Sequence, residues 1–118
     1  MLIAFSVAPS GAASDPAAAA SAVAESADGS VHDAVAAAVQ IVRASGLPHR
    51  TTSMFTEVEG EWDEVFAVVK AATEAVLPFG SRVSLVLKAD IRPGRTGEID
   101  GKVERLERAL EERGELGA

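Results

Sequence analysis

The chain has 118 residues, which is close to the usual size of one domain and allows one hydrophobic core rather than two. Apolar residues make up 47% and charged residues 25%, so the composition excludes a wholly disordered chain. The net charge of −7 opposes binding to a phosphate backbone, and the lack of cysteine excludes disulfides, thiolate zinc sites and a cysteine nucleophile.

No apolar run approaches the roughly 20 residues that span a bilayer, and no basic segment precedes the first apolar run. We therefore expect a soluble, cytoplasmic protein without nucleic-acid or membrane partners.

The first predicted element is a strand. The stretch "LIAFSVA" is short, contains aromatic and β-branched residues, and is followed by "PSG", so it favours a strand with Ile3, Phe5 and Val7 on one face. Residues 12–28 are rich in alanine and contain one large apolar side chain, Val23. We interpret this segment as an insertion, either a loop or a loosely attached helical extension, because it can bury little surface.

Three helices are predicted from a repeated spacing of apolar residues at i, i+4, i+7 and i+11, which marks one face of a helix. The three sets are Val31, Val35, Ala38 and Val42; Val65, Val69, Ala72 and Val76; and Ile99, Val103, Leu106 and Leu110. Ser30 and Asp33 resemble a capping box for the first helix, an acidic turn at 59–64 begins the second, and Thr96 is the expected cap of the third.

Two further regions have the pattern of strands. "PHRTTSMFTEVEG" is rich in threonine and predicts one strand or two short strands with a bend near 53–55. "SRVSLVLKADIR" alternates between two faces, as expected for a sheet that is packed under helices on one side and more polar on the other. The apolar face contains Val83, Leu85, Leu87, Ala89 and Ile91.

The order of these elements predicts an α+β protein with the ferredoxin-like βαββαβ plan. We expect a single domain over residues 1–118, with an antiparallel sheet, two helices on one of its faces, and an additional C-terminal helix. The other face of the sheet must be covered or stay polar, so we expect either dimerisation through the sheet or docking of the third helix across it.

The charged residues do not suggest a catalytic or metal site. Glu57, Glu59, Glu61, Asp63 and Glu64 carry the oxygen ligands that hard metals prefer, yet most are spread around one helical turn, where they complement the helix dipole instead. His32 fits an exposed helix start and His49 a strand edge. No nucleophile with a base and an orienting group can be assembled, so we expect neither an enzyme nor a metal.

Several polar strand residues are candidates for a binding surface. Lys88 and Asp90 are two residues apart and share one face of their strand, where they either pair with each other or bracket a ligand. Ser6, Ser84 and the hydroxyl groups of residues 51–56 belong to the same sheet. Such a polar group on a sheet is either an interface or a pocket.

The stretches "LIAFSVAPSG", "TSMFTEVEGEWDEVF" and "LKADIR" followed by "GKVERLERAL" together resemble the thiamine-binding protein family of small ferredoxin-like domains. The resemblance covers almost the whole chain except residues 12–28. It implies a non-catalytic domain that forms homodimers or homotetramers and binds thiamine or a related, hydroxymethylpyrimidine-like pyrimidine as its ligand, with no other cofactor.

The resemblance also implies a set of ligand-binding residues. Hydroxyl groups would bind the aminopyrimidine, Glu59 or Asp90 would pair with its amino group or face the thiazolium cation, and Met54 and Phe55 would pack against the rings. Phe55 stands where the family commonly has a small residue, so it either fills or lines the pocket. The alternative is a structural or regulatory homo-oligomer whose polar sheet face is only an interface. The candidate residues are Ser6, Thr52, Met54, Phe55, Thr56, Glu59, Lys88 and Asp90.

Overall fold

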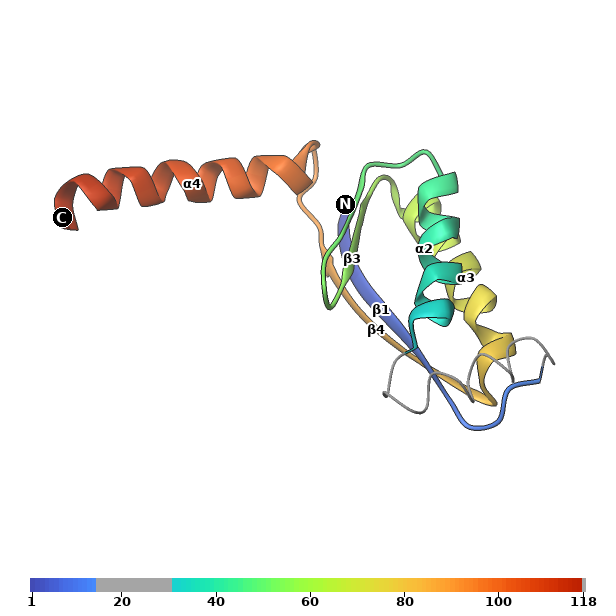
Figure 1. The fold of residues 1–118 in the computed structure, drawn as a ribbon. Coiled ribbons are helices and arrows are strands. Elements are labelled where there is room, and N and C mark those ends of the chain that lie inside the picture. Colours follow the sequence, from blue (N-terminus) through green and yellow to red (C-terminus); the bar gives the residue numbers. More distant parts are fainter. Residues whose placement is uncertain (15–30, 118) are drawn as a thin grey trace.

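The structure is a computed structural model that describes residues 1–14 and 31–117 (Figure 1). Ser30 and most of the alanine-rich insertion lie outside these residues. The elements in chain order are β1 (Leu2–Ser10), α2 (His32–Ala44), β2 (His49–Thr51), β3 (Thr56–Glu59), α3 (Trp62–Val76), the 3-10 helix η1 (Leu77–Phe79), β4 (Arg82–Asp90) and α4 (Glu98–Gly117).

The four strands form one antiparallel sheet in the order β2-β3-β1-β4, and α2 and α3 lie on the same face of it (Figure 1). The predicted ferredoxin-like α+β fold with an additional C-terminal helix is therefore confirmed. The threonine-rich region forms two short strands separated by a bend at residues 52–55, which is the second of the two arrangements predicted for it.

The central strand β1 has unequal neighbours. It pairs with β4 over all nine of its residues, from Leu2 opposite Asp90 to Ser10 opposite Arg82, but with β3 only from Leu2 to Phe5. Beyond Phe5 the edge of β1 on the β3 side has no strand partner among the described residues. Pro9, which has no N–H to donate, is compatible with a strand that has one free edge.

The core lies between the sheet and the two helices. Ile3, Phe5 and Val7 of β1 are buried, as predicted, and so is the predicted face of α3, which consists of Val65, Val69, Ala72 and Val76. The face of α2 differs from the prediction, because Val31 and Val35 are each 39% exposed. Its buried residues are Ala34, Ala38 and Val42, whose two alanines allow α2 to lie close to its neighbours.

The C-terminal helix does not pack across the sheet of its own chain. Figure 1 shows α4 extending away from the body of the domain, on the opposite side of the sheet from α2 and α3. Ile99, in its first turn, is 8% exposed, whereas Leu106 is 56% and Leu110 51% exposed. The radius of gyration is 17.4 Å, above the roughly 13.5 Å of a compact chain of this length. The helix is therefore an arm, and docking on its own sheet is not the solution that this chain adopts.

Replacement of Ile3 tests the position of the core. Ile3 is 0% exposed, so Ile3→Ala should lower the free energy of unfolding by about 2–5 kcal/mol through lost burial and a residual cavity. Leu77→Ala is the control, because Leu77 is 51% exposed and its loss should change the free energy by about 0.5 kcal/mol or less. Urea denaturation measures both, and equal effects of the two substitutions would contradict this assignment.

Candidate functional site

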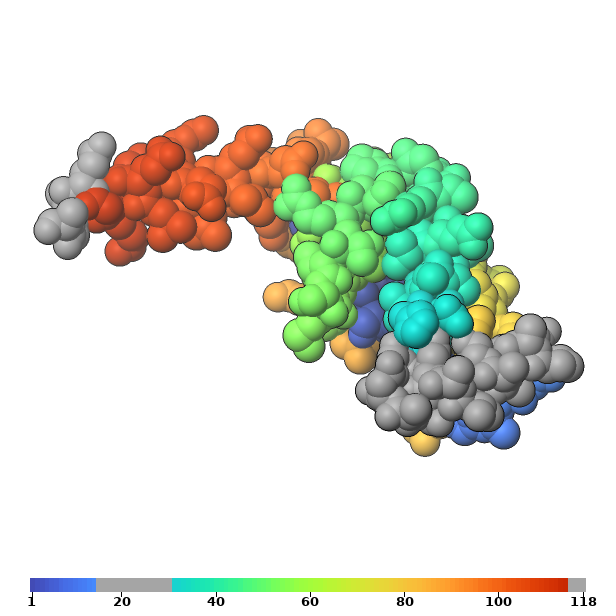
Figure 2. Space-filling view, in the orientation of Figure 1, coloured from blue at the N-terminus to red at the C-terminus, as the bar shows by residue number. Residues whose placement is uncertain are grey.

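A cavity of about 130 Å³ lies between α2, the free edge of β1 and the bend that joins β2 to β3. It exists because β3 ends opposite Phe5 while β1 continues, so that no strand fills this side of β1. In Figure 2 atoms of β1 (blue) are seen between the β2–β3 segment (green) and the start of α2 (cyan). The cavity is lined by Phe5, Ser6, Val7, Val35, Ala38, Val39 and residues 51–56.

The bend at residues 52–55 forms one wall and is held by Thr52. The Thr52 N–H donates to the Phe55 carbonyl oxygen at 2.9 Å, and the Thr52 hydroxyl donates to the same oxygen at 3.0 Å. The hydroxyl oxygen also accepts from the Phe55 N–H at 3.3 Å. A threonine that bonds to the nearby backbone in this way replaces the glycine-containing turns that hairpins commonly use. The hydroxyl of Thr52 is thus largely committed to shaping the wall.

The lining of the cavity is uncharged. None of its described residues carries an ionisable group, and Phe5, Val35 and Val39 supply apolar walls. Thr56 is only 7% exposed and contributes a hydroxyl group that makes no side-chain hydrogen bond within the described residues, and Ser6 borders the cavity at the free edge of β1. Such a site suits a small neutral ring that packs on apolar surface and forms a few directed hydrogen bonds.

Phe55 lines this cavity beside the open space. It is 37% exposed, and the neighbouring Met54 is 75% exposed. Because about 130 Å³ remains unfilled next to the ring, Phe55 does not occupy the whole volume. Both side chains are available at the rim as a flat and a flexible apolar contact surface.

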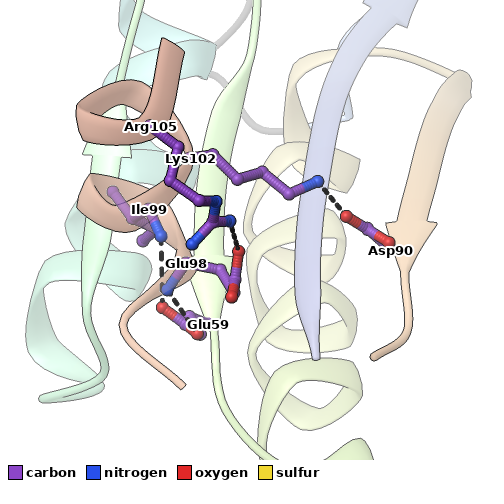
Figure 3. A network of polar contacts seen from close by, with 6 residues as sticks. All are labelled: Glu59, Asp90, Glu98, Ile99, Lys102 and Arg105. Atoms are coloured by element: carbon purple, nitrogen blue, oxygen red, sulfur yellow. Dashed lines mark hydrogen bonds and ion pairs between the residues drawn. The ribbon is translucent and has the colours of Figure 1, made fainter. Parts of the chain in front are cut away.

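Five of the predicted site residues, Ser6, Thr52, Met54, Phe55 and Thr56, therefore line one cavity, whereas Glu59, Lys88 and Asp90 do not. The carboxylate of Glu59 accepts hydrogen bonds from the backbone N–H groups of Glu98 and Ile99, at 3.0 and 3.4 Å (Figure 3). It therefore caps the start of α4, which begins at Glu98, so the predicted cap Thr96 is replaced by a residue of β3.

Asp90 is likewise engaged with α4. Its carboxylate accepts a hydrogen bond from Lys102, which lowers the pKa of Asp90, and Glu98 accepts one from Arg105 at 2.6 Å, which lowers the pKa of Glu98 (Figure 3). Lys88 is exposed on the uncovered face of the sheet and forms no ion pair with Asp90. The acids at this end of the sheet thus anchor a helix.

The acidic residues that follow β3 also have a structural role. Glu61 and Glu64 form a capping box at the start of α3, in which the Glu61 N–H donates to the Glu64 carboxylate at 3.1 Å.

Within residues 1–14 and 31–117, no three histidine or acidic side chains are grouped so as to hold a metal ion. In the same part of the chain no helix is long and apolar enough to cross a membrane.

Comparison with known proteins identifies the family. The sequence model described as thiamine-binding protein matches residues 19–107, which is more than half of the chain. The chain belongs to the thiamine-binding protein family. A relative in Mycobacterium bovis, the UPF0045 protein Mb1933, is 49% identical over 81 residues, covering 68% of this chain and 79% of that protein.

Solved structures of similar proteins have the same fold. A domain of unknown function, DUF77, from Bacillus cereus has a TM-score of 0.66 at 30% identity and covers 86% of this chain and 85% of that one. A Thermotoga maritima protein named as a candidate thiamine biosynthesis/salvage protein has a TM-score of 0.65 at 24% identity, over 89% of this chain and 96% of that one. The second likeness concerns the fold alone.

The cap on α4 can be tested with Glu59→Ala. Loss of a buried charged acceptor should lower the free energy of unfolding by about 1.5–3 kcal/mol and speed amide hydrogen exchange in the first turn of α4. Exchange measured by mass spectrometry should stay unchanged in Glu104→Ala, which removes an exposed acid from the same helix. Unaltered exchange at Glu98 and Ile99 in Glu59→Ala would refute the capping role.

The anchoring of α4 should weaken in acid. The pKa values of Asp90 and Glu98 are lowered in the folded state. Each carboxylate therefore stabilises the fold above its unfolded-state pKa, which is about 3.9 for an aspartate and about 4.3 for a glutamate. This stabilisation is lost as the pH falls through the lowered folded-state pKa values. Lys102→Gln removes the partner of Asp90. The difference in unfolding free energy between wild type and Lys102→Gln should therefore be constant from about pH 8 to 6 and shrink below about pH 4. A difference in unfolding free energy that does not change with pH would contradict the role of the Lys102–Asp90 pair in anchoring α4.

Proposed function

We propose that this protein binds thiamine or a related pyrimidine, without catalysing a reaction, in the cavity between α2 and the β2–β3 bend. One observation carries the proposal: Ser6, Thr52, Met54, Phe55 and Thr56 surround a single cavity. Ser6 is more than 40 positions away in sequence from the other four, and all five belong to the segments that resemble the family. Membership of the thiamine-binding protein family supports the same ligand class.

The volume and the lining favour one ring of thiamine inside the cavity. About 130 Å³ is less than the roughly 300–1,000 Å³ of pockets that enclose drug-sized ligands. The aminopyrimidine is neutral and needs hydrogen-bonding partners, which the hydroxyl of Thr56 and the unpaired backbone edge of β1 beyond Phe5 supply. The thiazolium carries a positive charge and has no counter-ion in this lining, so we place it outside the mouth, where the negative net charge of the protein is favourable.

Binding without turnover is supported by the residue types at the cavity. Its described lining has no histidine, carboxylate, lysine or cysteine that could transfer a proton or attack a substrate. The hydroxyl of Ser6 would need a neighbouring base to act as a nucleophile, and the described lining offers none. The chemistry of the cavity is thus recognition by packing and hydrogen bonding.

The proposed assembly is a homo-oligomer. A specific observation also favours the second candidate function, a structural or regulatory homo-oligomer without a ligand: α4 exposes a row of large apolar side chains. Exposed apolar patches commonly mark protein interfaces. The two candidate functions involve different surfaces, so they can be tested separately.

Isothermal titration calorimetry tests ligand binding. Thiamine and 4-amino-5-hydroxymethyl-2-methylpyrimidine should each give saturable heat. Thr56→Val should weaken binding by about 3- to 10-fold, because it removes a hydroxyl on the cavity side of the sheet and one hydrogen bond contributes about 0.5–1.5 kcal/mol. Ser84→Ala is the matched control, since it removes a strand hydroxyl outside the cavity. A flat titration of folded protein with both ligands would overturn the proposal.

A further inference from the structure

We infer that the main chain of Val7, at the free edge of β1, determines which ring the cavity accepts. Its N–H donates to a ring nitrogen, and its C=O accepts from the amino group next to that nitrogen. The ligand class is therefore a planar heterocycle with an acceptor beside an exocyclic amino group, and rings with the reversed pattern are rejected. The inference rests on the proposed function, because it concerns the same cavity, and it assigns the selectivity of that cavity to a backbone position.

The hydrogen bonds between β1 and β3 show which main-chain groups of β1 face the cavity. At the start of the strand the Met1 amino group donates to the Gly60 carbonyl oxygen at 2.9 Å, and the Gly60 N–H donates to the Met1 carbonyl oxygen at 3.0 Å. The main-chain groups of successive strand residues point alternately to the two neighbouring strands, so those of every odd-numbered residue of β1 point to the β3 side. The pairing of β1 with β4 continues over all nine residues without a bulge, so the alternation extends to Val7.

Val7 is the first residue of this series that lacks a strand partner. Phe5 pairs with Thr56, the first residue of β3, and no residue of β3 lies opposite Val7. The N–H and C=O of Val7 therefore face the cavity, which Val7 helps to line. Val7 is only 8% exposed, and these two groups have no hydrogen-bonding partner within residues 1–14 and 31–117. Buried main-chain groups are almost always hydrogen-bonded, so this pair indicates where a polar group binds.

Pro9 limits what can bind along this edge. It is the next residue in the series and has no N–H. Beyond Phe5 the free edge of β1 therefore offers one main-chain donor, at Val7, and the carbonyl oxygens of Val7 and Pro9. A peptide that added to the sheet as a strand would need a donor at Pro9 to continue the ladder. The edge is thus unsuited to strand addition and suited to a short ligand that uses the Val7 pair alone.

The aminopyrimidine has the pattern that matches Val7. Its ring nitrogen accepts a hydrogen bond and the adjacent amino group donates one, as the C=O and N–H of a residue in a neighbouring strand do. A 4-oxopyrimidine has an N–H and a carbonyl at these two positions, so each would face a like group of Val7. Turning the ring over restores the match, but it directs the substituent that carries the thiazolium to the opposite end of the edge. The hydroxyl of Thr56 does not distinguish the two rings, because it donates or accepts by rotation.

Calorimetry with thiamine and its 4-oxo analogue, oxythiamine, tests the selectivity. Thiamine should bind about 100-fold more tightly, because the analogue loses two hydrogen bonds and leaves two buried groups unpaired. Thr56→Val is the matched variant: it should weaken both ligands by a similar factor and leave their ratio unchanged. Equal affinity of the wild type for the two ligands would overturn the inference. A ratio that collapses in Thr56→Val would assign the selectivity to the hydroxyl and overturn it as well.

Amide hydrogen exchange, followed by NMR on isotope-labelled protein, locates the contact. Saturation with 4-amino-5-hydroxymethyl-2-methylpyrimidine should slow the exchange of the Val7 N–H by about 10-fold or more. The N–H groups of Ser6 and Ala8 point to β4 and are the internal controls, since their exchange should slow much less. Unchanged exchange at Val7 in the saturated protein would show that the ligand binds without this contact.

The proposed function and the role of Val7 can fail separately. A flat titration with both thiamine and the free pyrimidine would remove the proposed function, and the role of Val7 with it. Saturable binding of thiamine together with equal binding of oxythiamine would remove the role of Val7 alone.

Discussion

The unequal pairing of β1 is the constraint on which the rest of this structure depends. Along β4 the strand is paired from end to end, but along β3 only its first four residues are paired. Where both neighbours are present, Ile3 and Phe5 are buried under the helices and form the centre of the core. Where β3 has ended, the same strand forms the floor of a cavity whose walls are α2 and the β2–β3 bend. The difference in strand length thus places the candidate site directly beside the core.

Polar contacts at the other end of the sheet determine the position of α4. Glu59 is 6% exposed and offers its carboxylate to two backbone N–H groups, which stabilises a helix start that would otherwise lack acceptors. The Lys102–Asp90 contact joins the next turn to the same region, and the Arg105–Glu98 contact lies within α4. Because the helix is attached by charged groups and the buried Ile99 in its first turns, the rest of its apolar row is not used for attachment. An arm held in this way can present that row to another molecule.

Local periodicity was sufficient to predict the elements, but contacts between distant residues were not predictable. The alternation in β1 and the spacing in α3 determine which residues are buried, because each reflects a single face. The spacing in α2 led to Val31 and Val35, although the buried residues include Ala34, since an alanine-rich helix has several similar faces and packing selects one. Glu59 was assigned to a ligand through the resemblance to the family. Its actual partners are 39 and 40 residues away, and no local pattern encodes that distance.

The cavity and the uncovered sheet face meet at Ser6. In the register of the sheet Ser6 lies opposite Val86, on the face that α2 and α3 leave uncovered, yet at the free edge of β1 it also lines the cavity. A strand edge without a partner allows both, because its backbone stays open to the cavity while the side chain points to the other face. Met54 and Phe55 reach the cavity from the other side, on a bend that Thr52 holds by its own hydrogen bonds. One strand therefore borders the cavity at its free edge and contributes side chains to the uncovered face of the sheet.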